Sequence, residues 1–369
     1  MKPVIVISAH RTFLRGGAVT MTGECLKSLV QKYKDKYQLK VLVYQKELYP
    51  SISQVEYIEF PHARKNAFYR LYYEYIFFKK LSKKWQPYLW VSMQDTTPNV
   101  VAKNRVVYLH NALPVEPLSL RYLTKSLHFF LLHFLYRYVY PLGIRKNNWI
   151  VVQQQSLADR LSNRFSIPNN KILLFPPEIA TPINTLIPKT EQFKTYTFIY
   201  PATVFPHRNF EVIIKAVKIL NDKDINNFEV IFTTDGRENS YASSLKKQSG
   251  SNITFKSFMP ASELHELYKV VNCLLFPSLV ESWGLPLSEF MQTNKPILAA
   301  DLPYAHETAS GYECVKFFDP KNAEQLAEYM LQVIKGELVF DKNIIIPNDK
   351  YETVYSWKQL FETVLPLNP

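Results

Sequence analysis

The residues with the clearest chemical potential are two glutamates that flank a turn, Glu281 and Glu289. An apolar run that ends at Phe276 predicts a strand, and Pro286 stands where the first turn of a following helix is expected. Gly284 permits close approach to the backbone, and amides at such a turn bind phosphate groups. Glutamates suit hydroxyl groups instead, so the segment predicts a site for a diphosphate joined to a sugar or ribose. Taken alone, the spacing favours the simpler interpretation of two solvated glutamates.

Other candidate residues follow predicted strands of the first half. His110 stands at the carboxyl end of the apolar run 105–109, and Asp95 comes just after another strand. Two adjacent glycines, Gly16 and Gly17, lie between the first predicted strand and the first predicted helix, where Gly-Gly is otherwise only a turn. Because ligands of open α/β sheets bind at the carboxyl ends of the strands, these positions are candidates for a binding site.

The elements that must position these residues alternate between short apolar runs and helical patterns. The expected strands are 4–8, 39–44, 55–60, 88–93, 105–109, 149–152, 197–200, 228–233, 253–255, 273–276, 296–299 and 315–318. The expected helices are 20–36, 66–84, 118–140, 210–221, 261–271, 286–293 and 322–335, with a last one beginning around 356 in a capping-box pattern. This alternation predicts βαβ units and mostly parallel sheets.

A proline-rich stretch at 175–188 interrupts the alternation and is the expected linker. The predicted fold class is therefore α/β, with two Rossmann-like doubly wound domains that face each other across a cleft. Residues 1–180 form the expected first domain and residues 181–348 the second. Residues 349–369 are expected to form a C-terminal helix that packs back towards the first domain.

Composition excludes large disordered stretches, since 47% of the 369 residues are hydrophobic and 21% are charged. The net charge of +12 is distributed unevenly. Residues 1–180 contain 26 basic and 10 acidic residues, a net charge of +16, whereas residues 181–369 contain 18 and 22, a net charge of −4. A surface this basic suits nucleic acid or an anionic membrane. Three widely separated cysteines indicate a reducing compartment.

The string 277–289, Pro-Ser-Leu-Val-Glu-Ser-Trp-Gly-Leu-Pro-Leu-Ser-Glu, resembles the signature of the family-4 (group 1) retaining glycosyltransferases of the GT-B fold. The usual form is Pro-Ser-x-x-Glu-Gly-Phe-Gly-Leu-Pro-x-x-Glu. This chain departs from it at Ser282 and Trp283, although Ser282 keeps its backbone amide. Segments 295–307 and 317–320 are similar to later landmarks of the family, and 149–155 to the end of its N-terminal domain.

A second element of the resemblance is 205–209, Phe-Pro-His-Arg-Asn. The family usually has a lysine here that binds the donor diphosphate. Arg208 takes its place and can bind phosphate oxygens with two nitrogens at once. Many members have another arginine upstream, where this chain has Ala202 and Thr203, so His207 is the candidate substitute.

The resemblance also implies roles for the individual residues. Glu289 is expected to hold the ribose hydroxyls and Glu281 a sugar hydroxyl, while His110 resembles a histidine that touches the transferred sugar. No metal or cofactor is expected, because arginine and amide groups neutralise the leaving diphosphate. The predicted catalytic set is Glu281, His110 and Arg208, the predicted donor-binding set is Glu289, Gly284, Leu285, Ser282, Trp283, His207, Asn209, Gly16 and Gly17, and Asp95 is an acceptor-side candidate.

The implied activity is that of a retaining, metal-independent hexosyltransferase. Residues 1–180 would bind the acceptor and residues 181–348 the nucleotide-sugar, with a GDP-mannose-like donor favoured because Pro-His-Lys-Asn is typical of mannosyltransferase-like members. The acceptor is expected to be a saccharide, lipid-linked, in bacterial O-antigen or capsule assembly. Two alternatives stay open: a GT-B epimerase or phosphorylase, and a basic nucleic-acid-binding protein, although no nucleic-acid module is recognised.

The basic first half also predicts a location. The run 64–85 mixes aromatic residues with lysines and arginines, and a helix of this kind places aromatic rings at the acyl boundary and lysines at the headgroups. We therefore expect a cytoplasmic protein bound peripherally to the inner face of the cytoplasmic membrane, without a spanning segment. The equally simple interpretation of this run is that its aromatic residues are core and its lysines are solvated.

Overall fold

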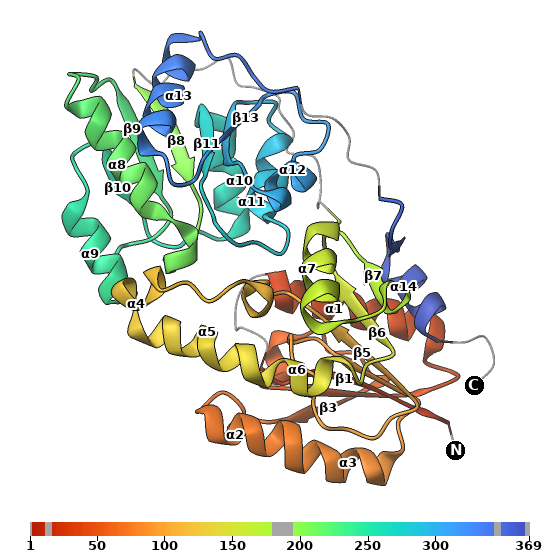
Figure 1. Ribbon diagram of the computed structural model, residues 1–369. Helices are drawn as coiled ribbons and strands as arrows, with labels where there is room; N and C mark the ends of the chain where they lie inside the picture. Colours follow the sequence, from red (N-terminus) through yellow and green to blue (C-terminus); the bar gives the residue numbers. More distant parts are fainter. Residues whose placement is uncertain (1, 12–16, 179–194, 343–347, 366–369) are drawn as a thin grey trace. The chain divides into compact units, whose positions relative to one another are not determined.

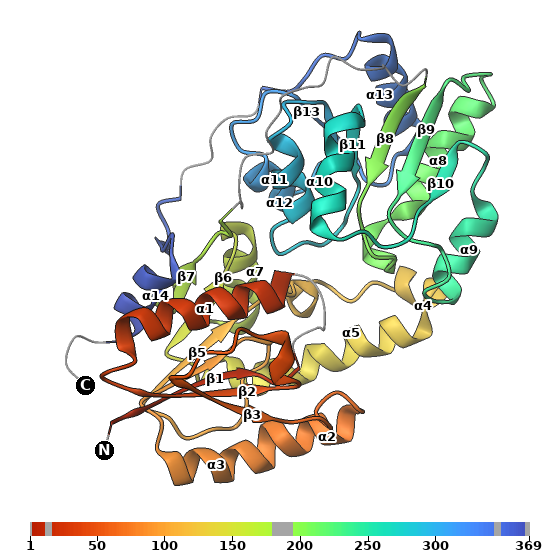
Figure 2. The ribbon, with the colours of Figure 1, turned by 180° about the vertical axis from the view of Figure 1, so that it is seen from behind.

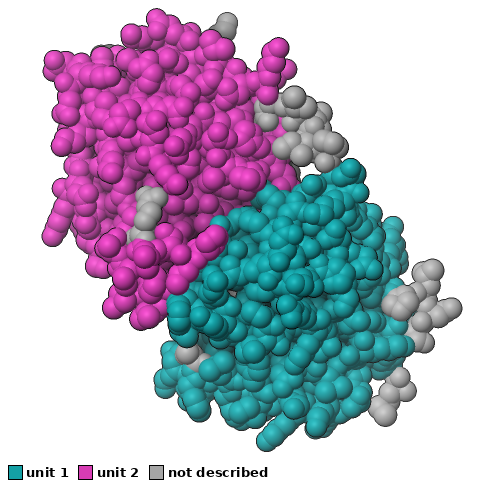
Figure 3. Space-filling view, viewed as in Figure 1, with its two compact units in different colours: residues 1–116, 133–178, 348–369 teal, residues 117–132, 179–347 magenta. Residues whose placement is uncertain are grey.

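The computed structural model describes residues 2–11, 17–178, 195–342 and 348–365, and the chain folds into two compact units. Unit 1 contains residues 1–116, 133–178 and 348–369, and unit 2 contains residues 117–132 and 179–347 (Figure 3). Each unit has its own sheet, and the two sheets are described separately below.

Unit 1 is built on an eight-stranded sheet in which all paired strands run parallel. The strand order is β14-β7-β6-β5-β4-β1-β2-β3 (Figure 1). The strands are β1 (Val4–Ala9), β2 (Gln38–Val43), β3 (Val55–Glu59), β4 (Leu89–Ser92), β5 (Asn104–Tyr108), β6 (Trp149–Val152), β7 (Ile172–Leu174) and β14 (Glu352–Thr353). Most of the central strand residues are fully buried, as expected for a parallel sheet that is covered on both faces.

Helices cover both faces of this sheet. They are α1 (Gly17–Tyr33), α2 (Ala67–Leu71), the π-helical turn η2 (Tyr72–Phe77), α3 (Phe78–Trp85), α6 (Pro141–Ile144), α7 (Gln155–Phe165) and α14 (Trp357–Val364). Residues 133–139 of α5 (Leu127–Val139) also belong to unit 1. Alternate residues of β1 separate the two faces: Ile5 and Ile7 pack with α1 and α14, whereas Val4 and Val6 pack with Phe78 of α3. Figure 2 shows α1 and α14 side by side on the first face.

Unit 2 has a six-stranded parallel sheet in the order β10-β9-β8-β11-β12-β13. Its strands are β8 (Tyr196–Tyr200), β9 (Phe228–Phe232), β10 (Ile253–Phe255), β11 (Cys273–Phe276), β12 (Ile297–Ala300) and β13 (Val315–Phe318). Its helices are α4 (Arg121–Lys125), α8 (Phe210–Asn221), α9 (Ser240–Gln248), α10 (Ala261–Val270), α11 (Leu285–Met291), α12 (Pro303–Thr308) and α13 (Ala323–Lys335), with the start of α5.

In both sheets the order of winding reverses at one point. The reversal lies between β1 and β4 in unit 1 and between β8 and β11 in unit 2. Loops that leave two such adjacent parallel strands diverge to opposite faces of the sheet, so a crevice opens at the carboxyl edge, which is where doubly wound folds bind ligands. These two switch points therefore define where functional residues of each unit are to be sought.

The expected domain division differs from the observed units at one segment. Residues 117–132 lie within the expected first domain, but they group with unit 2. The reason is side-chain contact: Phe129 stacks on His207 with 5.4 Å between ring centroids, and Lys125 forms an ion pair with Glu211. Residues 348–369 group with unit 1 through β14 and α14, and Ser356 caps α14 by accepting a hydrogen bond from the backbone of Gln359.

Two expected helices differ in form from the expectation. The run 66–84 forms one continuous helical segment, but its middle is π-helical over Tyr72–Phe77, and it begins at Asn66, whose side chain caps the backbone of Tyr69. The run 118–140 divides into α4 and α5 at Ser126, which adopts an extended backbone. The linker expected at 175–188 falls largely outside the described residues.

Two glycines provide a matched test of the packing of unit 1. A Cβ at Gly143 would lie 2.5 Å from the carbonyl oxygen of Thr97, whereas a Cβ at Gly23 in α1 would meet only Pro50 at 3.7 Å. Gly143→Ala is therefore expected to destabilise the protein by about 1–3 kcal/mol, and Gly23→Ala to stabilise it by about 0.5–1 kcal/mol, because alanine is the better helix former. Urea unfolding followed by circular dichroism measures both. Equal stability of Gly143→Ala and wild type would contradict the close approach of α6 to Thr97.

Candidate active site

The candidate site of unit 2 is built from two loops that leave adjacent strands. β8 and β11 pair in parallel, with Phe198 opposite Cys273, so their carboxyl ends lie at the same edge of the sheet. One loop runs from β8 into the short 3-10 helix η5 (Pro206–Arg208), and the other runs from β11 to α11. Residues far apart in the sequence thereby meet at the switch point of the sheet.

Hydrogen bonds join these two loops into one framework. The amide of Leu279 donates to the carbonyl of His207 at 2.8 Å, and the buried Tyr200 hydroxyl donates to the carbonyl of Arg208 at 2.7 Å. On the other loop, the hydroxyl of Tyr304 donates to the carbonyl of Ser278 at 2.6 Å. Because backbone groups are held from both sides, the loops are preorganised rather than free to move separately.

Asn209 completes this framework from the β8 loop. Its backbone is left-handed, with φ at 56°, a conformation that asparagine tolerates better than most residues. Its buried side-chain amide donates to the carbonyls of Pro277 at 3.3 Å and Pro320 at 2.8 Å. Asn209, which is predicted to bind the donor, therefore also holds three loops together.

The two predicted catalytic residues of this unit form an ion pair. Glu281 is only 8% exposed, and its carboxylate pairs with the guanidinium of Arg208, which is 27% exposed and also donates to Ser278 at 3.3 Å. Burial lowers the pKa of Arg208, an effect that Tyr200 and Tyr304 partly oppose. Within the described part of the chain, the Nε of Arg208 is buried without a hydrogen-bond partner. A charged donor therefore remains available beside the paired acid.

The loop before α11 has the backbone that the signature predicts. Gly284 caps α11 with φ at 90°, and a Cβ there would lie 3.2 Å from the ring of Phe276. Both facts require glycine at this position. Trp283 is fixed by its indole N–H, which donates to the hydroxyl of Ser288 at 3.1 Å, and by its carbonyl, which accepts from Thr308. Ser282, its neighbour, is partly exposed.

Glu289 stands on α11, and its carboxylate faces two residues of α10. The hydroxyl of Tyr268 donates to it at 3.5 Å, and the Nε2 of His265 lies 3.9 Å away. Burial raises the pKa of Glu289, while His265 and the Tyr268 hydrogen bond oppose the rise. With 24% of its side chain exposed, Glu289 is accessible to a ligand. His265 and Tyr268 were not predicted from the sequence, because no motif marks them and only the packing of α10 on α11 brings them here.

His207 has a different environment from that expected of a second phosphate-binding cation. It is buried, and its ring stacks on Phe129 and on Phe205, at 5.4 and 5.7 Å between centroids. This packing gives His207 a structural role in attaching the segment 117–132 to unit 2. Its predicted contact with the donor remains a prediction.

In unit 1, His110 follows β5 as expected. Its ring is stacked on Tyr108 at 4.5 Å, and its Nε2 is buried without a hydrogen-bond partner within the described residues. Burial lowers its pKa, while the charge of Asp95 and a backbone hydrogen bond with Met93 oppose this shift. With Met93 accepting from Nδ1–H, the neutral ring presents a lone pair at Nε2, which can accept a hydrogen bond from a hydroxyl group.

Asp95 positions the loop that carries His110. Its carboxylate accepts hydrogen bonds from the backbone amides of His110 and Asn111, and its own backbone is left-handed, with φ at 65°. These contacts explain its place beside the site, and its acceptor-side role stays a prediction. Of the predicted glycine pair, Gly16 lies outside the described residues, and Gly17 begins α1.

Two doubly wound parallel sheets, each with candidate residues near its switch point, match the architecture expected of GT-B glycosyltransferases. The predicted pair of Rossmann-like domains is thereby confirmed. Residues 184–348 match the family model of the group 1 glycosyl transferases. This match supports a group 1 glycosyltransferase, in agreement with the signature at 277–289.

One characterised relative is the O-antigen chain mannosyltransferase RfbU of Salmonella typhimurium strain LT2, which is 25% identical over 177 residues. The match covers 47% of this chain and 47% of that protein, about half of the relative's length.

Solved structures resemble nearly the whole chain. A glycosyltransferase from Rickettsia africae has a TM-score of 0.61 at 15% identity and covers 98% of this chain and 92% of its own. WaaG, a glycosyltransferase involved in lipopolysaccharide biosynthesis, has a TM-score of 0.62 at 14% identity, with 90% of both chains covered. Anabaena HepE, solved with UDP and glucose, has a TM-score of 0.60 at 14% identity, again with 90% of both chains covered. At these identities the likeness shows the fold.

The pKa of His110, measured by NMR, tests whether its ring is held neutral by burial. We expect its imidazole to titrate below the ordinary value of about 6.5, because burial disfavours the charged ring. Asp95→Asn keeps a side-chain oxygen for the backbone amides but removes the charge, so it should lower the pKa of His110 further. Ring-proton shifts between pH 4 and 8, assigned with His110→Gln, measure both values. Titration at or above 6.5 would show that the ring is not held neutral.

Proposed function

We propose that this protein is a retaining glycosyltransferase that transfers a sugar from a nucleotide-diphosphate donor to a saccharide acceptor. The observation that carries the proposal is the ion pair between Arg208 and the buried Glu281 at the switch point of unit 2, inside the segment that matches the family model. The donor binds mainly to unit 2, and the acceptor binds to unit 1. A GDP-mannose-like donor is favoured by the Pro-His-Arg-Asn element and by the relative named as a mannosyltransferase.

In this proposal the donor diphosphate lies against the β8 and β11 loops. The guanidinium of Arg208, with its unpartnered Nε, binds phosphate oxygens, and the amides of Gly284 and Leu285 add neutral donors. Glu289 holds the ribose hydroxyls, for which its partly exposed carboxylate is suited. Ser282 and Trp283 shape the loop around the phosphates.

Catalysis in this proposal is electrostatic. As the bond between the sugar and the diphosphate breaks, negative charge grows on the phosphate oxygen, and Arg208 stabilises it without a metal ion. Glu281 orients Arg208 and accepts a hydrogen bond from a sugar hydroxyl, while the neutral Nε2 of His110 accepts another. The acceptor oxygen attacks from the face that the leaving group occupies and passes its proton to the departing phosphate, so the anomeric configuration is retained.

The acceptor is proposed to be a lipid-linked saccharide of a bacterial surface polysaccharide. The support comes from the charge of the first half and from relatives whose names refer to O-antigen and lipopolysaccharide synthesis. An acceptor carried by a membrane lipid requires the enzyme to work at the membrane surface, on its cytoplasmic side, where nucleotide-sugars are made.

Unit 1 has a helical surface that fits such a membrane. Along the segment from α2 to α3, four large apolar side chains are exposed: Phe68, Leu71, Tyr72 and Ile76. Four exposed lysines continue the same segment: Lys79, Lys80, Lys83 and Lys84. Other aromatic residues of the run pack inward: Phe78 is fully buried, and Tyr73, Phe77 and Trp85 pack against the same cluster. Part of the run is therefore core, and its exposed part is amphipathic.

The surface lacks exposed acidic side chains. Glu74, the one acidic residue between Asn66 and Trp85, is buried and paired with Arg70. Apolar groups next to lysines favour an anionic lipid surface over a protein partner of mixed charge, because each lysine near such a surface contributes about 1 kcal/mol. No helix within the described ranges, 2–11, 17–178, 195–342 and 348–365, is long and apolar enough to cross a bilayer.

Donor binding tests the proposed site directly. Arg208→Lys keeps the charge beside Glu281 but loses the planar fork, and Glu289→Gln loses the ribose acceptor charge. Each is expected to weaken nucleotide-sugar binding by about 1.5–3 kcal/mol, or roughly ten- to a hundredfold in Kd. Titration calorimetry with UDP-, GDP- and dTDP-sugars measures this, and Arg237→Lys, an exposed arginine of unit 2, is the matched control. Unchanged affinity of both variants for every donor that wild type binds would refute the assignment.

Liposome flotation tests the membrane surface. Binding is expected to require anionic lipid and to weaken as salt is raised, because salt screens exposed charges. Replacing Lys79, Lys80, Lys83 and Lys84 by glutamate should abolish it, whereas glutamate at the exposed lysines Lys246 and Lys247 of unit 2 should not. Equal recovery on neutral and anionic vesicles would exclude this mode of attachment and favour a soluble acceptor.

A further inference from the structure

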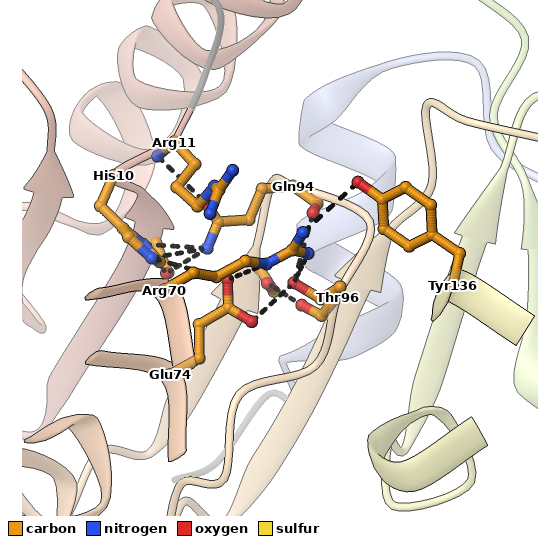
Figure 4. A network of polar contacts seen from close by, with 9 residues as sticks. His10, Arg11, Arg70, Glu74, Gln94, Thr96 and Tyr136 are labelled. Carbon is orange, nitrogen blue, oxygen red and sulfur yellow. Dashed lines mark hydrogen bonds and ion pairs between the residues drawn. The ribbon is translucent and has the colours of Figure 1, made fainter. Parts of the chain in front are cut away.

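The switch point of unit 1 holds a cluster of charged and polar side chains to which no role has been given. β1 ends at Ala9 and is followed by His10 and Arg11, and the adjacent strand β4 is followed by Gln94. The cluster, which we call the switch-point cluster, consists of His10, Arg11, Arg70, Glu74, Gln94, Thr96 and Tyr136 (Figure 4). It lies where a doubly wound sheet binds its ligand.

Within this cluster the acid is fully engaged. Glu74 is 1% exposed, one of its oxygens accepts from the Nε of Arg70 at 3.2 Å, and the other accepts from the hydroxyl of Thr96 at 3.0 Å. Arg70 is engaged as well, because its other two nitrogens donate to Thr96 at 3.2 Å and to the hydroxyl of Tyr136 at 3.3 Å. Burial opposes the charge of Arg70, but Glu74 and Tyr136 outweigh it and raise its pKa.

His10 adds no charge to the cluster. It is fully buried, and it contacts the amide of Gln94 at 2.9 Å and the ring of Phe78 at 4.7 Å between centroids. Its pKa is well below the ordinary value because of burial and, secondarily, the charges of Arg11 and Arg70. The ring is therefore neutral, and the charge balance of the cluster rests on two arginines and one glutamate.

Arg11 is the member without a counter-charge of its own. Its backbone amide donates to Gln94 at 3.0 Å, but one terminal nitrogen of its guanidinium is buried without a hydrogen-bond partner among the described residues. Burial lowers the pKa of Arg11, and Arg70 lowers it further, an effect that Glu74 only partly offsets. Buried donors are almost always paired, so an unpartnered arginine nitrogen at a ligand-binding edge requires an explanation.

We propose that the switch-point cluster binds a phosphate group of the acceptor, with Arg11 as the residue that contacts the phosphate oxygens. The proposal rests on the proposed function, because it names the chemical class of the acceptor. A guanidinium presents paired donors that match phosphate oxygens, and an anion there supplies both the missing acceptor and the missing charge. Arg70 positions Glu74 and Tyr136 and adds positive potential, as does Arg64, which also lowers the pKa of Arg11.

Phosphate fits better than a neutral hydroxyl or a carboxylate. Hydroxyl groups of sugars are best bound by a free carboxylate, and the one in this cluster is already occupied by Arg70 and Thr96. A carboxylate carries a single charge, whereas a phosphate or diphosphate carries more and gains more from several arginines. Such a group is found both in soluble sugar phosphates and in lipid diphosphates, and binding experiments can separate these two sources.

The first test measures binding of inorganic diphosphate by calorimetry in the presence of saturating GDP or UDP, which occupies the donor site. Arg11→Met is expected to weaken diphosphate binding at least tenfold, and Arg11→Lys less. Arg137→Met, which removes an exposed arginine of the same unit, should change nothing. Geranyl diphosphate that binds more tightly than inorganic diphosphate supports a lipid-linked source, and equal affinity supports a soluble one. Diphosphate binding by Arg11→Met at the wild-type level would overturn the proposal.

The second test separates binding from a structural role. If Arg11 serves the ligand, Arg11→Met should unfold at the same temperature as wild type or higher, because it removes an uncompensated buried charge. Arg70→Met should unfold at a lower temperature, because it leaves Glu74 buried without its partner. A fall in the unfolding temperature of Arg11→Met as large as that of Arg70→Met would overturn the proposal.

The outcomes distinguish a failure at the donor site from a failure of the acceptor-phosphate assignment. If nucleotide-sugars fail to bind, the proposed function fails at Arg208, and diphosphate binding that depends on Arg11 is still measured without nucleotide. If nucleotide-sugars bind and Arg11→Met leaves diphosphate binding intact, only the assignment of the acceptor phosphate fails.

Discussion

The parallel pairing of β8 with β11 is the constraint on which the candidate active site depends. Neighbouring strands lie about 4.8 Å apart, so the loops that follow them begin side by side although the sequence separates them widely. A backbone hydrogen bond from Leu279 to His207 then fixes one loop to the other. The hydroxyl of Tyr200 holds the carbonyl of Arg208, whose guanidinium pairs with Glu281. A largely buried ion pair adds little to stability by itself, which agrees with the proposed role of this pair in binding.

The same constraint acts in unit 1, where β1 pairs with β4. It brings Arg11, Gln94 and the Arg70–Glu74 pair to one edge of the sheet. The two switch points differ in their chemistry. In unit 2, Arg208 is paired with Glu281 and has one unpartnered nitrogen among the described residues. In unit 1, Arg11 stands near Glu74, an acid that is already paired with Arg70. This difference supports assigning the donor to one unit and an anionic acceptor to the other.

The sequence predicted the parallel strands and the segment 277–289 well, because buried strands and a glycine with a positive φ leave local patterns. It did not predict the residues that depend on packing between distant elements. His265 and Tyr268 meet Glu289 only because α10 packs on α11. From the sequence, Arg70 and Glu74 are typical of surface charges, whereas in the structure Glu74 is buried. Likewise, residues 117–132 group with unit 2 because Phe129 stacks on His207, a contact between aromatic residues that no spacing reveals.

We propose that the β8 and β11 loops bind the diphosphate of a nucleotide-sugar, and a crystal structure of the protein with a nucleoside diphosphate would decide this. We expect phosphate oxygens about 2.7–3.2 Å from the guanidinium of Arg208 and ribose hydroxyls at the carboxylate of Glu289. We also expect Glu281 to stay beside Arg208 when the nucleotide is bound. A nucleotide found away from both loops, or one whose phosphates make no contact with Arg208, would show that this is not the donor site.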